Sequence, residues 1–415
     1  MTAKSLLWEK DAPIIRSLVE TDVYKLKMLY YIWIYYPYLR VKWAFTNRKV
    51  QIPLAKYVSV GALKEQLQAV MELRFSDDDI KYLMKRNEFS VKFLEELKKL
   101  RLSMPVVREC NGQLVIEVEG TWLETTLWEI YILAIVAELY GRGRAREMGI
   151  DEKSIYDASM QRLEEKIEFL TLHPELKINL YGLRRRLSGL FEDLMIQAMT
   201  QRTNCIISVS NMYLARKNNV QSDGTNAHEL PMAESAIARH ISPEAVRQSP
   251  YEVLRKWEKL YGYSSLKMLS DTYGTEAFLS QLPQEIAVRW AGHRQDSGDP
   301  FVIGEMIIAD YIRRGIDPSD KIIIFADGLD CQLMLRLYDR FASRINVGFG
   351  VGTNFSNDHG FFEALSIVVK LIEAAGNPTV KLSDNLAKGM GPEAEQQVIK
   401  SIFGYNGDFY QATRY

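Results

Sequence analysis

After about residue 140, short apolar runs alternate with helical stretches, and this pattern limits the fold more than any other feature of the chain. The clearest unit is KIIIFADG (321–328), which is followed by the helix-like LDCQLMLRLYDRFAS and then by RINVGFGVGT (344–353). Further helices are predicted over 158–171, 188–201 and 243–261. Short β-rich runs separated by helices are typical of βα units around a parallel sheet or barrel.

The first 140 residues follow a different pattern. Thr21-Asp22 precede VYKLKMLYYIWIYY, so a helix is predicted to begin near residue 22, and LRVKWAFTNR (39–48) alternates like a strand. Residues 76–100 predict surface helices with an acidic first turn, and VIEVEG (115–120) predicts a strand that ends in glycine. The segment TWLETTLWEIYILAIVAELY that follows predicts a long, largely buried helix.

Together these patterns predict an α/β chain with two domains. We expect an N-terminal α+β domain over 1–140 and an irregular, incomplete α/β-barrel-like domain over 141–415. The segment LSIVVKLIEAAGNPTVKLSD (365–384) instead predicts a hairpin that turns at Gly376-Asn377-Pro378. Part of this C-terminal segment is a candidate for completing the N-terminal domain.

Charge and cysteine content exclude several classes of function. The chain has 52 basic and 53 acidic residues, so bulk attraction to nucleic acid is not expected. Its three cysteines are widely spaced and form no Cys-x-x-Cys pair, which argues against a disulfide framework and favours a reducing compartment. The start of the chain has no apolar core suited to a signal peptide, and the most apolar window (127–139) is too short to span a bilayer. We therefore expect a cytoplasmic protein without nucleic-acid or membrane partners.

Four segments place polar groups at the end of an apolar run or in a glycine-marked loop, where α/β folds bind ligands. The first is RQDSGDP (294–300), in which Asp296 and Asp299 flank a turn at Ser297-Gly298. Two carboxylates there would suit ribose hydroxyls or a magnesium ion on pyrophosphate. The alternative is a turn that only caps the helix after Pro300.

The second segment is GFGVGTN (348–354), in which three glycines alternate at the end of an apolar strand. Backbone N–H groups left exposed there could bind a phosphate, although a bulged, closely packed strand is the alternative. The run ADGLD (326–330) adds Asp327 at a second strand end.

The third and fourth segments supply cations and a titratable group. In YGLRRRLS (181–188) three consecutive arginines cannot all point the same way, so at least one is expected to turn inward, where it could hold a carboxylate or phosphate. The alternative is a solvated basic turn. In SDGTNAHE (222–229), His228 follows a glycine-containing loop, although a single loop histidine is more often structural. No HExxH or similar spacing occurs, so a metal site built on histidines is not expected.

Taken together, the four segments suit a phosphorylated sugar that reacts with an anionic small molecule. Their order also resembles that of the nicotinate phosphoribosyltransferase family along nearly the whole chain. The motifs that carry the resemblance are TDVYKLKM (21–28), GTWLETTLWEIYILAIVAE (120–138), RRRLS (184–188), SNMYLARK (210–217), GTNAHE (224–229), LSDTYGTEAF (269–278), RQDSGDP (294–300), GFGVGTNFSND (348–358) and IVVKLIE with KLSDNLAK (367–388).

This resemblance implies a type II phosphoribosyltransferase fold and a specific reaction. Nicotinate and phosphoribosyl pyrophosphate (PRPP) would give nicotinate mononucleotide and pyrophosphate, with Mg²⁺ bound by PRPP and pyrophosphate. ATP would be a co-substrate, coupled through a phosphohistidine in the manner of a ligase. The resemblance also implies a homodimer with its active site at the subunit interface.

The resemblance assigns catalytic roles to three residues. His228 matches the phosphorylated histidine, Asp271 the carboxylate that orients it, and Arg294 an arginine of the nicotinate and phosphate pocket. Arg184 matches a second arginine of that pocket, and Tyr24 an aromatic that stacks on the pyridine ring from the neighbouring subunit.

It assigns substrate contacts to five further positions. Asp296 and Asp327 match acidic residues near the ribose hydroxyls. Gly350, Gly352 and Thr353 match the segment that binds the 5′-phosphate.

Two stretches near the base pocket depart from the family pattern. The family usually has Asp-Phe-Gly-Thr before its arginines where this chain has Leu180-Tyr181-Gly182-Leu183, and Gly-Thr-Ser-Asn where this chain has Ser208-Val209-Ser210-Asn211. Relatives that use nicotinamide carry an acidic residue at the position of Ser210, so a serine favours the acid as substrate. Alternatives are a nicotinamide or quinolinate phosphoribosyltransferase, a catalytically silent nucleotide-binding paralogue, and an aldolase-like enzyme that uses Lys370.

Overall fold

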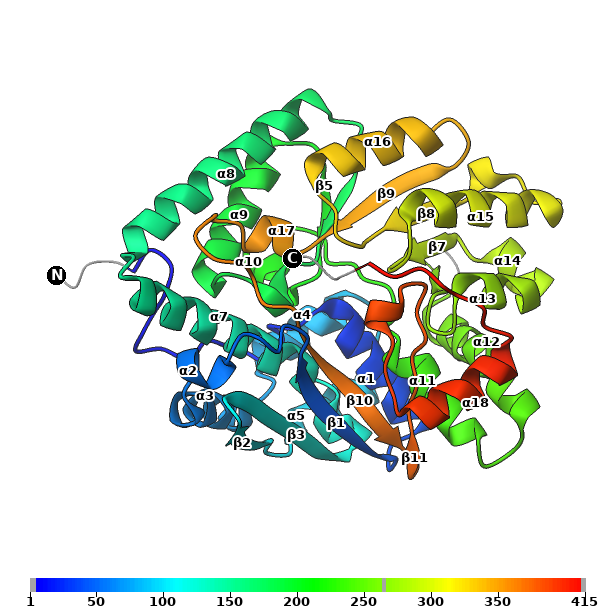
Figure 1. The fold of residues 1–415 in the computed structure, drawn as a ribbon, viewed down its shortest axis with the longest axis horizontal. Coiled ribbons are helices and arrows are strands. Elements are labelled where there is room, and N and C mark those ends of the chain that lie inside the picture. The colour runs from blue at the N-terminus through cyan, green and yellow to red at the C-terminus, as the bar shows by residue number, and fades with distance from the viewer. Residues whose placement is uncertain (1–4, 263–265, 412–415) are drawn as a thin grey trace.

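The computed structural model describes residues 5–262 and 266–411, whose helices and strands form two packed parts (Figure 1). One part contains a five-stranded antiparallel sheet in the order β11-β10-β1-β3-β2, and the other a six-stranded parallel sheet in the order β5-β4-β9-β8-β7-β6. The strands are β1 (Arg40–Asn47), β2 (Val106–Cys110), β3 (Gln113–Thr121), β4 (Ile178–Leu180), β5 (Ile206–Val209), β6 (Lys267–Leu269), β7 (Gly292–Gln295), β8 (Ile322–Phe325), β9 (Asn346–Val351), β10 (Ile367–Ala374) and β11 (Asn377–Pro378).

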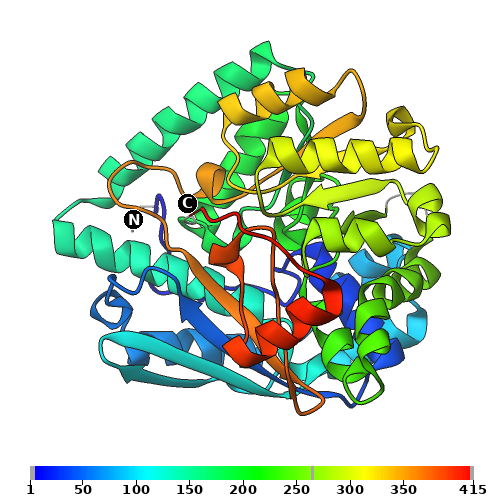
Figure 2. The same cartoon turned by 45° about the vertical axis from the view of Figure 1, so that its right-hand side comes forward.

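Helices surround both sheets. Figure 2 shows α15 and α16, coloured yellow to orange, on the outer side of the parallel sheet. The helices of the N-terminal part are α1 (Val23–Tyr35), α2 (Leu54–Tyr57), α3 (Val60–Glu72), α4 (Asp77–Lys85), α5 (Val91–Lys99), α6 (Trp122–Thr125) and α7 (Trp128–Met148). Those that follow are α8 (Glu152–Leu172), η1 (Leu183–Arg185), α9 (Gly189–Arg202), α10 (Met212–Lys217), α11 (Glu229–Ala238), α12 (Pro243–Tyr261), α13 (Thr275–Gln281), α14 (Gln284–Arg289), α15 (Pro300–Arg313), η2 (Pro318–Asp320), α16 (Cys331–Phe341), α17 (Thr353–Ser356), η3 (Leu386–Lys388) and α18 (Glu393–Phe403).

The predicted mixed α/β fold is confirmed, and the parallel sheet is open rather than a closed barrel. Most predicted elements are also present, among them α1 after Asp22, strand β1 and the unit β8-α16-β9. One predicted long helix is instead divided into α6 and α7, which are separated by Thr126-Leu127.

The predicted hairpin near residue 376 is present, but its turn lies at Ala375-Gly376 rather than at Gly376-Asn377-Pro378. Both turn residues have positive φ, 53° and 77°, as the tight turns that join antiparallel strands require. Strand β10 of this hairpin pairs with β1, from Val41 opposite Ala374 to Asn47 opposite Ile367. Figure 1 accordingly shows the orange β10 beside the blue β1, which comes from the other end of the chain.

The strand ends of the parallel sheet face the antiparallel part of the molecule. Because all six strands run in the same direction, the segments after β4, β7, β8 and β9 leave the sheet at one edge. The first turn of α1 is joined to this edge, since Val23 N–H donates to the carbonyl of Ser210, 2.8 Å away, just after β5. Residues from the first 30 positions therefore lie beside the ends of strands that follow much later.

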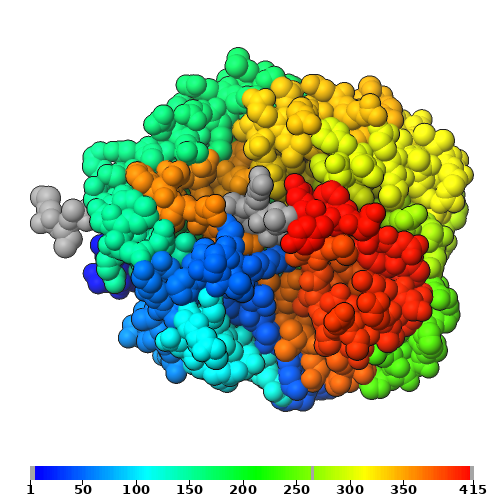
Figure 3. All heavy atoms as spheres, viewed as in Figure 1, coloured from blue at the N-terminus to red at the C-terminus, as the bar shows by residue number. Residues whose placement is uncertain are grey.

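The C-terminal segment packs on the loop that precedes α18. Leu386 N–H donates to Phe409 O (3.0 Å), and Asn385 Nδ2 donates to Gln411 O (2.9 Å). In the space-filling view the red C-terminal residues accordingly adjoin the orange segment before them (Figure 3). No helix within residues 5–262 and 266–411 combines the length and apolarity that crossing a bilayer requires.

Candidate active site

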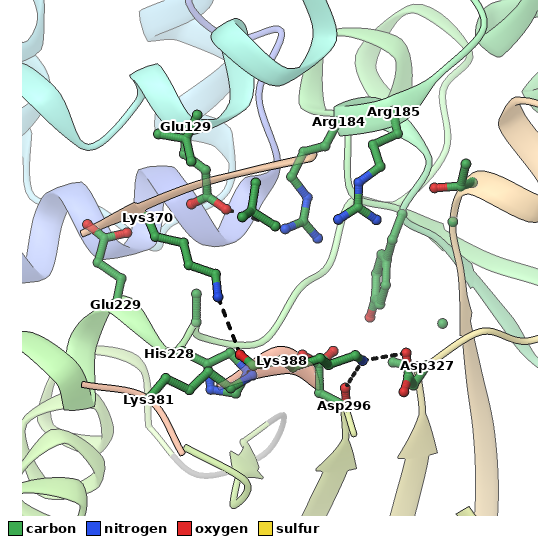
Figure 4. A pocket seen from close by; sticks show the side chains of 18 of the residues that line it. Glu129, Arg184, Arg185, His228, Glu229, Asp296, Asp327, Lys370, Lys381 and Lys388 are labelled. Carbon is green, nitrogen blue, oxygen red and sulfur yellow. Dashed lines mark hydrogen bonds and ion pairs between the residues drawn. The ribbon is translucent and has the colours of Figure 1, made fainter. Parts of the chain in front are cut away.

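A pocket of about 200 Å³ lies between the strand ends of the parallel sheet and β10 of the antiparallel sheet (Figure 4). Nine of the eleven residues predicted for the site line this pocket: Tyr24, Arg184, His228, Arg294, Asp296, Asp327, Gly350, Gly352 and Thr353. Asp271 and Ser210 lie behind its wall. The volume far exceeds the roughly 30 Å³ that one water occupies in the liquid, so a small-molecule ligand can enter.

His228 immediately precedes α11, and hydrogen bonds on both ring nitrogens hold its imidazole. Nδ1 lies 2.9 Å from Thr272 Oγ1, and Nε2 lies 3.1 Å from Asp296 Oδ2 and 2.8 Å from Lys381 Nζ. Burial and the neighbouring Lys381 ammonium lower the pKa of His228 and outweigh the two nearby carboxylates. A neutral imidazole, which is a potential nucleophile, is therefore favoured at neutral pH.

Asp271, the residue expected to orient the histidine, lies close to the ring but outside hydrogen-bonding distance. Its Oδ1 is 3.6 Å from His228 Nε2, while its Oδ2 accepts a 2.5 Å hydrogen bond from Ser297 Oγ. The adjacent Thr272 makes the contact with Nδ1 instead. Thr272 directly follows Asp271 in LSDTYG, so its hydroxyl could have been recognised in the sequence as a candidate contact for His228.

His228, Asp271 and Asp296 each offer one potential metal ligand atom, and these atoms lie within 4.8 Å of one another. However, Lys381 Nζ is already 2.8 Å from His228 Nε2 and 3.5 Å from Asp271 Oδ2. An ammonium group therefore supplies the positive charge that a metal ion would bring, and a metal bound to all three residues would have to displace it.

The three consecutive arginines have three different environments. Arg184 and Arg185 line the pocket, whereas Arg186 is fully buried and pairs with Glu20 (2.7 Å) and Glu192 (2.9 Å). Arg184 and Arg185 lie in η1, where successive side chains are rotated by about 120°, whereas Arg186 follows the end of η1 with extended backbone, which turns its side chain into the interior. The prediction that at least one arginine turns inward is confirmed.

Arg184 lies between two carboxylates at the base of the pocket. Its Nε is 3.6 Å from Asp22 Oδ2, and its Nη1 is 3.4 Å from Glu129 Oε1. Asp22 is the N-cap residue of α1, but its side chain caps no backbone N–H and instead accepts a 2.5 Å hydrogen bond from Ser210 Oγ. Ser210 therefore acts on the pocket indirectly, through its hydroxyl contact with Asp22 and its carbonyl contact with Val23 N–H.

Tyr24 lies in the pocket of its own chain. It was expected to come from a neighbouring subunit, but the link between α1 and the end of β5 brings it to the pocket without a second copy. Tyr181 lies on the pocket wall as well, with the Arg294 guanidinium 6.0 Å from its ring centroid. Tyr181 was not predicted from the sequence, and it stands in one of the departures from the family pattern.

Arg294 and Asp296 form one unit at the end of β7. Arg294 Nη2 is 2.6 Å from Asp296 Oδ1, and its Nη1 donates to Thr225 Oγ1 at 2.9 Å. Asp299 does not join them, because its side chain caps α15 by accepting from the N–H groups of Phe301 and Val302. Of the two carboxylates in RQDSGDP, only Asp296 faces the pocket, and the capping alternative holds for Asp299.

The glycine-rich end of β9 passes very close to Tyr181. A Cβ on Gly350 would lie 2.5 Å from a carbon of the Tyr181 ring, whereas a Cβ on Gly352 would meet only Tyr181 O, at 3.5 Å. Gly352 is followed by α17, whose first residue is Thr353. Glycine at position 350 is therefore needed for packing, while Gly352 leaves open space in front of a helix start.

Lysines cover one side of the pocket, and of these the sequence had singled out only Lys370, for the aldolase-like alternative. Lys388 pairs with Asp327 (2.5 Å) and donates to Asp296 O (2.8 Å), and Lys370 donates to Lys388 O at 3.4 Å (Figure 4). Burial and the neighbouring cations Arg48, Lys381 and Lys388 lower the pKa of Lys370 well below its usual range. This side of the pocket suits an anion with several charges, such as a phosphate or pyrophosphate.

The departures from the family pattern largely avoid the pocket. Leu180, Leu183, Ser208 and Val209 are all buried and do not belong to its lining. Ser208 Oγ, for example, donates to Asn179 Oδ1 at 2.6 Å inside the sheet. These four substitutions therefore change the packing behind the site rather than its surface.

Comparisons with known proteins agree with this arrangement. A profile of the nicotinate phosphoribosyltransferase (NAPRTase) family matches residues 176–407, and a profile of the NAPRTase N-terminal domain matches residues 19–137. Among solved structures, the chain is similar to nicotinate phosphoribosyltransferase from Vibrio cholerae (29% identity, 97% of this chain and 96% of that chain covered, TM-score 0.87). It is also similar to a putative nicotinate phosphoribosyltransferase from Saccharomyces cerevisiae (28%, 95% and 100%, 0.86) and to the enzyme from Porphyromonas gingivalis (26%, 94% and 100%, 0.82).

Proposed function

Because this chain belongs to the nicotinate phosphoribosyltransferase family, we propose that it joins nicotinate to the phosphoribosyl group of PRPP and releases pyrophosphate. The main support is one juxtaposition: Arg184 and two tyrosines lie in the same pocket as the Arg294–Asp296 unit and the end of β9. Such a pocket can receive a flat anionic ring beside a sugar phosphate. The product would enter NAD biosynthesis.

In the proposed reaction the lone pair of the pyridine nitrogen forms the bond to the anomeric carbon as the bond from that carbon to pyrophosphate breaks. The pyridine nitrogen is already nucleophilic, so no general base is needed. Tyr24 and Tyr181 would hold the ring by its faces, and Arg184 would bind its carboxylate by charge-assisted hydrogen bonds. Binding both substrates in line would supply much of the rate.

The ribose and phosphate groups would bind at the ends of three neighbouring strands. Asp296 and Asp327 would accept hydrogen bonds from the ribose hydroxyls, after β7 and β8 respectively. The backbone of Gly350, Gly352 and Thr353 would bind the 5′-phosphate. Lys370, Lys381 and Lys388 would face the departing pyrophosphate and stabilise its charge.

Mg²⁺ is proposed to accompany PRPP and pyrophosphate. Asp296 and Asp327 offer the hard oxygen donors that Mg²⁺ prefers, and each side chain is 21% exposed. These two carboxylates would hold the ion together with the substrate's own phosphate oxygens. Bound there, the ion would neutralise charge on the leaving group.

ATP is proposed as a co-substrate that phosphorylates His228. If Nδ1 carries the proton and donates it to Thr272 Oγ1, Nε2 presents its lone pair toward the pocket and Lys381. Phosphorylation would add about two negative charges at neutral pH, which would alter the electrostatics of the PRPP site. Formation of nicotinate mononucleotide by purified protein, with and without ATP, tests the reaction and its coupling.

Three further tests address the alternatives. Parallel assays with nicotinate, nicotinamide and quinolinate test base choice, and we expect nicotinate to be preferred. PRPP binding without pyrophosphate release would instead favour a silent paralogue. An aldolase-like use of Lys370 predicts borohydride trapping of a carbonyl substrate, which we do not expect.

A homodimer and a cytoplasmic location stay predictions. Tyr24 lies in the pocket of its own chain, so a dimer is not needed to supply this residue. Analytical ultracentrifugation across a concentration series tests the dimer.

A further inference from the structure

A line of charged residues along one wall of the pocket joins Arg184 to the helix that begins after His228, through Glu129, Lys25 and Glu229. Lys25 lies at its centre, with no side-chain exposure, and its Nζ is 2.6 Å from Glu129 Oε2 and 2.5 Å from Glu229 Oε2. The other oxygen of Glu129 lies 3.4 Å from Arg184 Nη1. Figure 4 shows Glu129 and Glu229 on the same side of the pocket, with Arg184 beside Glu129.

Glu229 is the better fixed of the two carboxylates. It accepts hydrogen bonds from Lys25 Nζ (2.5 Å), Trp122 Nε1 (2.5 Å) and Thr126 Oγ1 (2.7 Å). It is also the first residue of α11 and directly follows His228 in the chain. The position of the His228 backbone therefore depends on the same carboxylate that Lys25 contacts.

Glu129 makes the equivalent connection to the other end of the pocket. It lies in the first turn of α7, and its contacts are the ammonium of Lys25 on one oxygen and the guanidinium of Arg184 on the other. The contact between Arg184 and Glu129 is long, so it positions the guanidinium but leaves N–H donors available for a further partner. Arg184 can therefore keep its position and still bind a substrate carboxylate.

The charge on Lys25 is essential to this arrangement. Burial alone would lower its pKa, but the two adjacent carboxylates outweigh burial and raise it, so Lys25 stays protonated. Without the ammonium, two buried carboxylates would face each other across the same space, and one would have to take up a proton or move.

We propose that Lys25 is a positioning residue that holds Arg184 and His228 in fixed relative positions through Glu129 and Glu229. This inference rests on the proposed function, in which Arg184 binds the base and His228 carries the phosphoryl group. Lys25 itself touches no substrate, and it links nicotinate binding to ATP coupling.

The test compares Lys25→Met with a matched control, Lys27→Met. Lys27 lies on the same helix, is buried and pairs with Glu88 at 2.8 Å, but does not line the pocket. We expect Lys25→Met to raise the KM for nicotinate about tenfold or more, since displacement of a positioned group by about 1 Å can cost a hundredfold in rate. We also expect it to lower the ratio of rates with and without ATP. Lys27→Met should lose thermal stability but keep both values.

Two more variants separate positioning from a purely structural role. Lys25→Met/Glu229→Gln removes the unpaired buried charge, so its Tm should recover while the KM for nicotinate stays raised. If KM and ATP stimulation recover together with Tm, Lys25 only stabilises the fold and the inference is overturned. Glu129→Gln, which leaves Lys25 and Glu229 paired, should raise the KM for nicotinate and leave ATP stimulation near wild type, and an unchanged KM there also overturns it.

Assays of the wild-type protein distinguish failure of the proposed function from failure of the positioning role. If it forms no nicotinate mononucleotide from nicotinate and PRPP, the proposed function itself is wrong. If it is active and Lys25→Met keeps the wild-type KM and ATP stimulation, the function stands and the positioning role does not.

Discussion

Gly350 and Tyr181 pack so closely that a Cβ on the glycine would lie 2.5 Å from Cε2 of the tyrosine ring. Two successive strand ends of the pocket, those of β4 and β9, are therefore in direct contact where a base and a phosphate would have to lie side by side. The neighbouring Gly352 has no such restriction, and this difference allows packing and ligand binding to be tested separately.

We expect Gly350→Ala and Gly352→Ala to have different effects. Alanine at 350 must displace Tyr181 or the strand, so it should lower Tm and raise the KM for nicotinate, because overpacking costs about 1–3 kcal/mol. Alanine at 352 meets only ordinary contacts in the protein, so Tm should stay near wild type. If a phosphate lies against this backbone, the KM for PRPP should nevertheless rise. An unchanged KM for PRPP in Gly352→Ala would place the phosphate elsewhere.

His228→Ala should abolish stimulation by ATP and leave slow turnover without ATP. The variant removes the nitrogen that would accept the phosphoryl group but leaves the walls of the base pocket and the end of β9 in place. Rates of nicotinate mononucleotide formation with and without ATP measure this, and His240→Ala is the control, because His240 follows the same helix and contacts Ala375 O and Asn377 away from the pocket. ATP stimulation that survives in His228→Ala would remove the residue from its proposed role.

Arg294→Ala should weaken binding of nicotinate or of the product by about 2–5 kcal/mol, the usual cost of truncating one partner of a buried charge pair. The variant leaves Asp296 without the guanidinium that lies 2.6 Å from its Oδ1. Arg294→Lys should be intermediate, because it keeps the charge but loses the planar pair of donors. Calorimetric titration with nicotinate mononucleotide measures the loss, and near-native affinity in Arg294→Ala would contradict the placement.

The elements of this fold were predictable where the signal is local. The unit β8-α16-β9 has short apolar strands and an amphipathic helix, so its pattern specifies it without reference to the rest of the chain. The pairing of β10 with β1 was not predictable in this way. Ile367 and Asn47 are more than 300 positions apart, and neither segment has a local pattern that identifies the strand it pairs with. The sequence therefore predicted individual strands of the antiparallel sheet but not how they pair.

The same difference between clear and weak local signals explains which pocket residues could be predicted. His228, Asp296 and Gly352 stand in conspicuous loops, and the structure brings them to one pocket. Lys381 and Lys388 carry no comparable signal, because a lysine in a polar loop is usually a solvated surface residue. Asp296 and Asp299 looked equivalent in sequence, and only the start of α15 decides that Asp299 caps a helix while Asp296 faces the pocket.

The contact between Lys381 and His228 leads to a prediction about pH. Burial and Lys381 lower the pKa of His228, so the native imidazole stays neutral below its ordinary value of 6.5 and loses its nucleophilic lone pair only at lower pH. ATP stimulation in the wild-type protein should therefore persist below pH 6.5 and fall as the pH drops through the lowered pKa. Replacing Lys381 by methionine removes the ammonium 2.8 Å from Nε2 but leaves Asp271 and Asp296, which favour the imidazolium.

The acid limb of ATP stimulation in Lys381→Met should consequently move to higher pH than in the wild type. Lys388→Met is the comparison, because it removes another pocket cation, one that pairs with Asp327, and should lower activity without moving the limb. Stimulation ratios measured from pH 5 to 8 at saturating ATP distinguish the two variants. A limb that moves to lower pH in Lys381→Met, or equally in both variants, would mean that this lysine does not hold His228 in its neutral form.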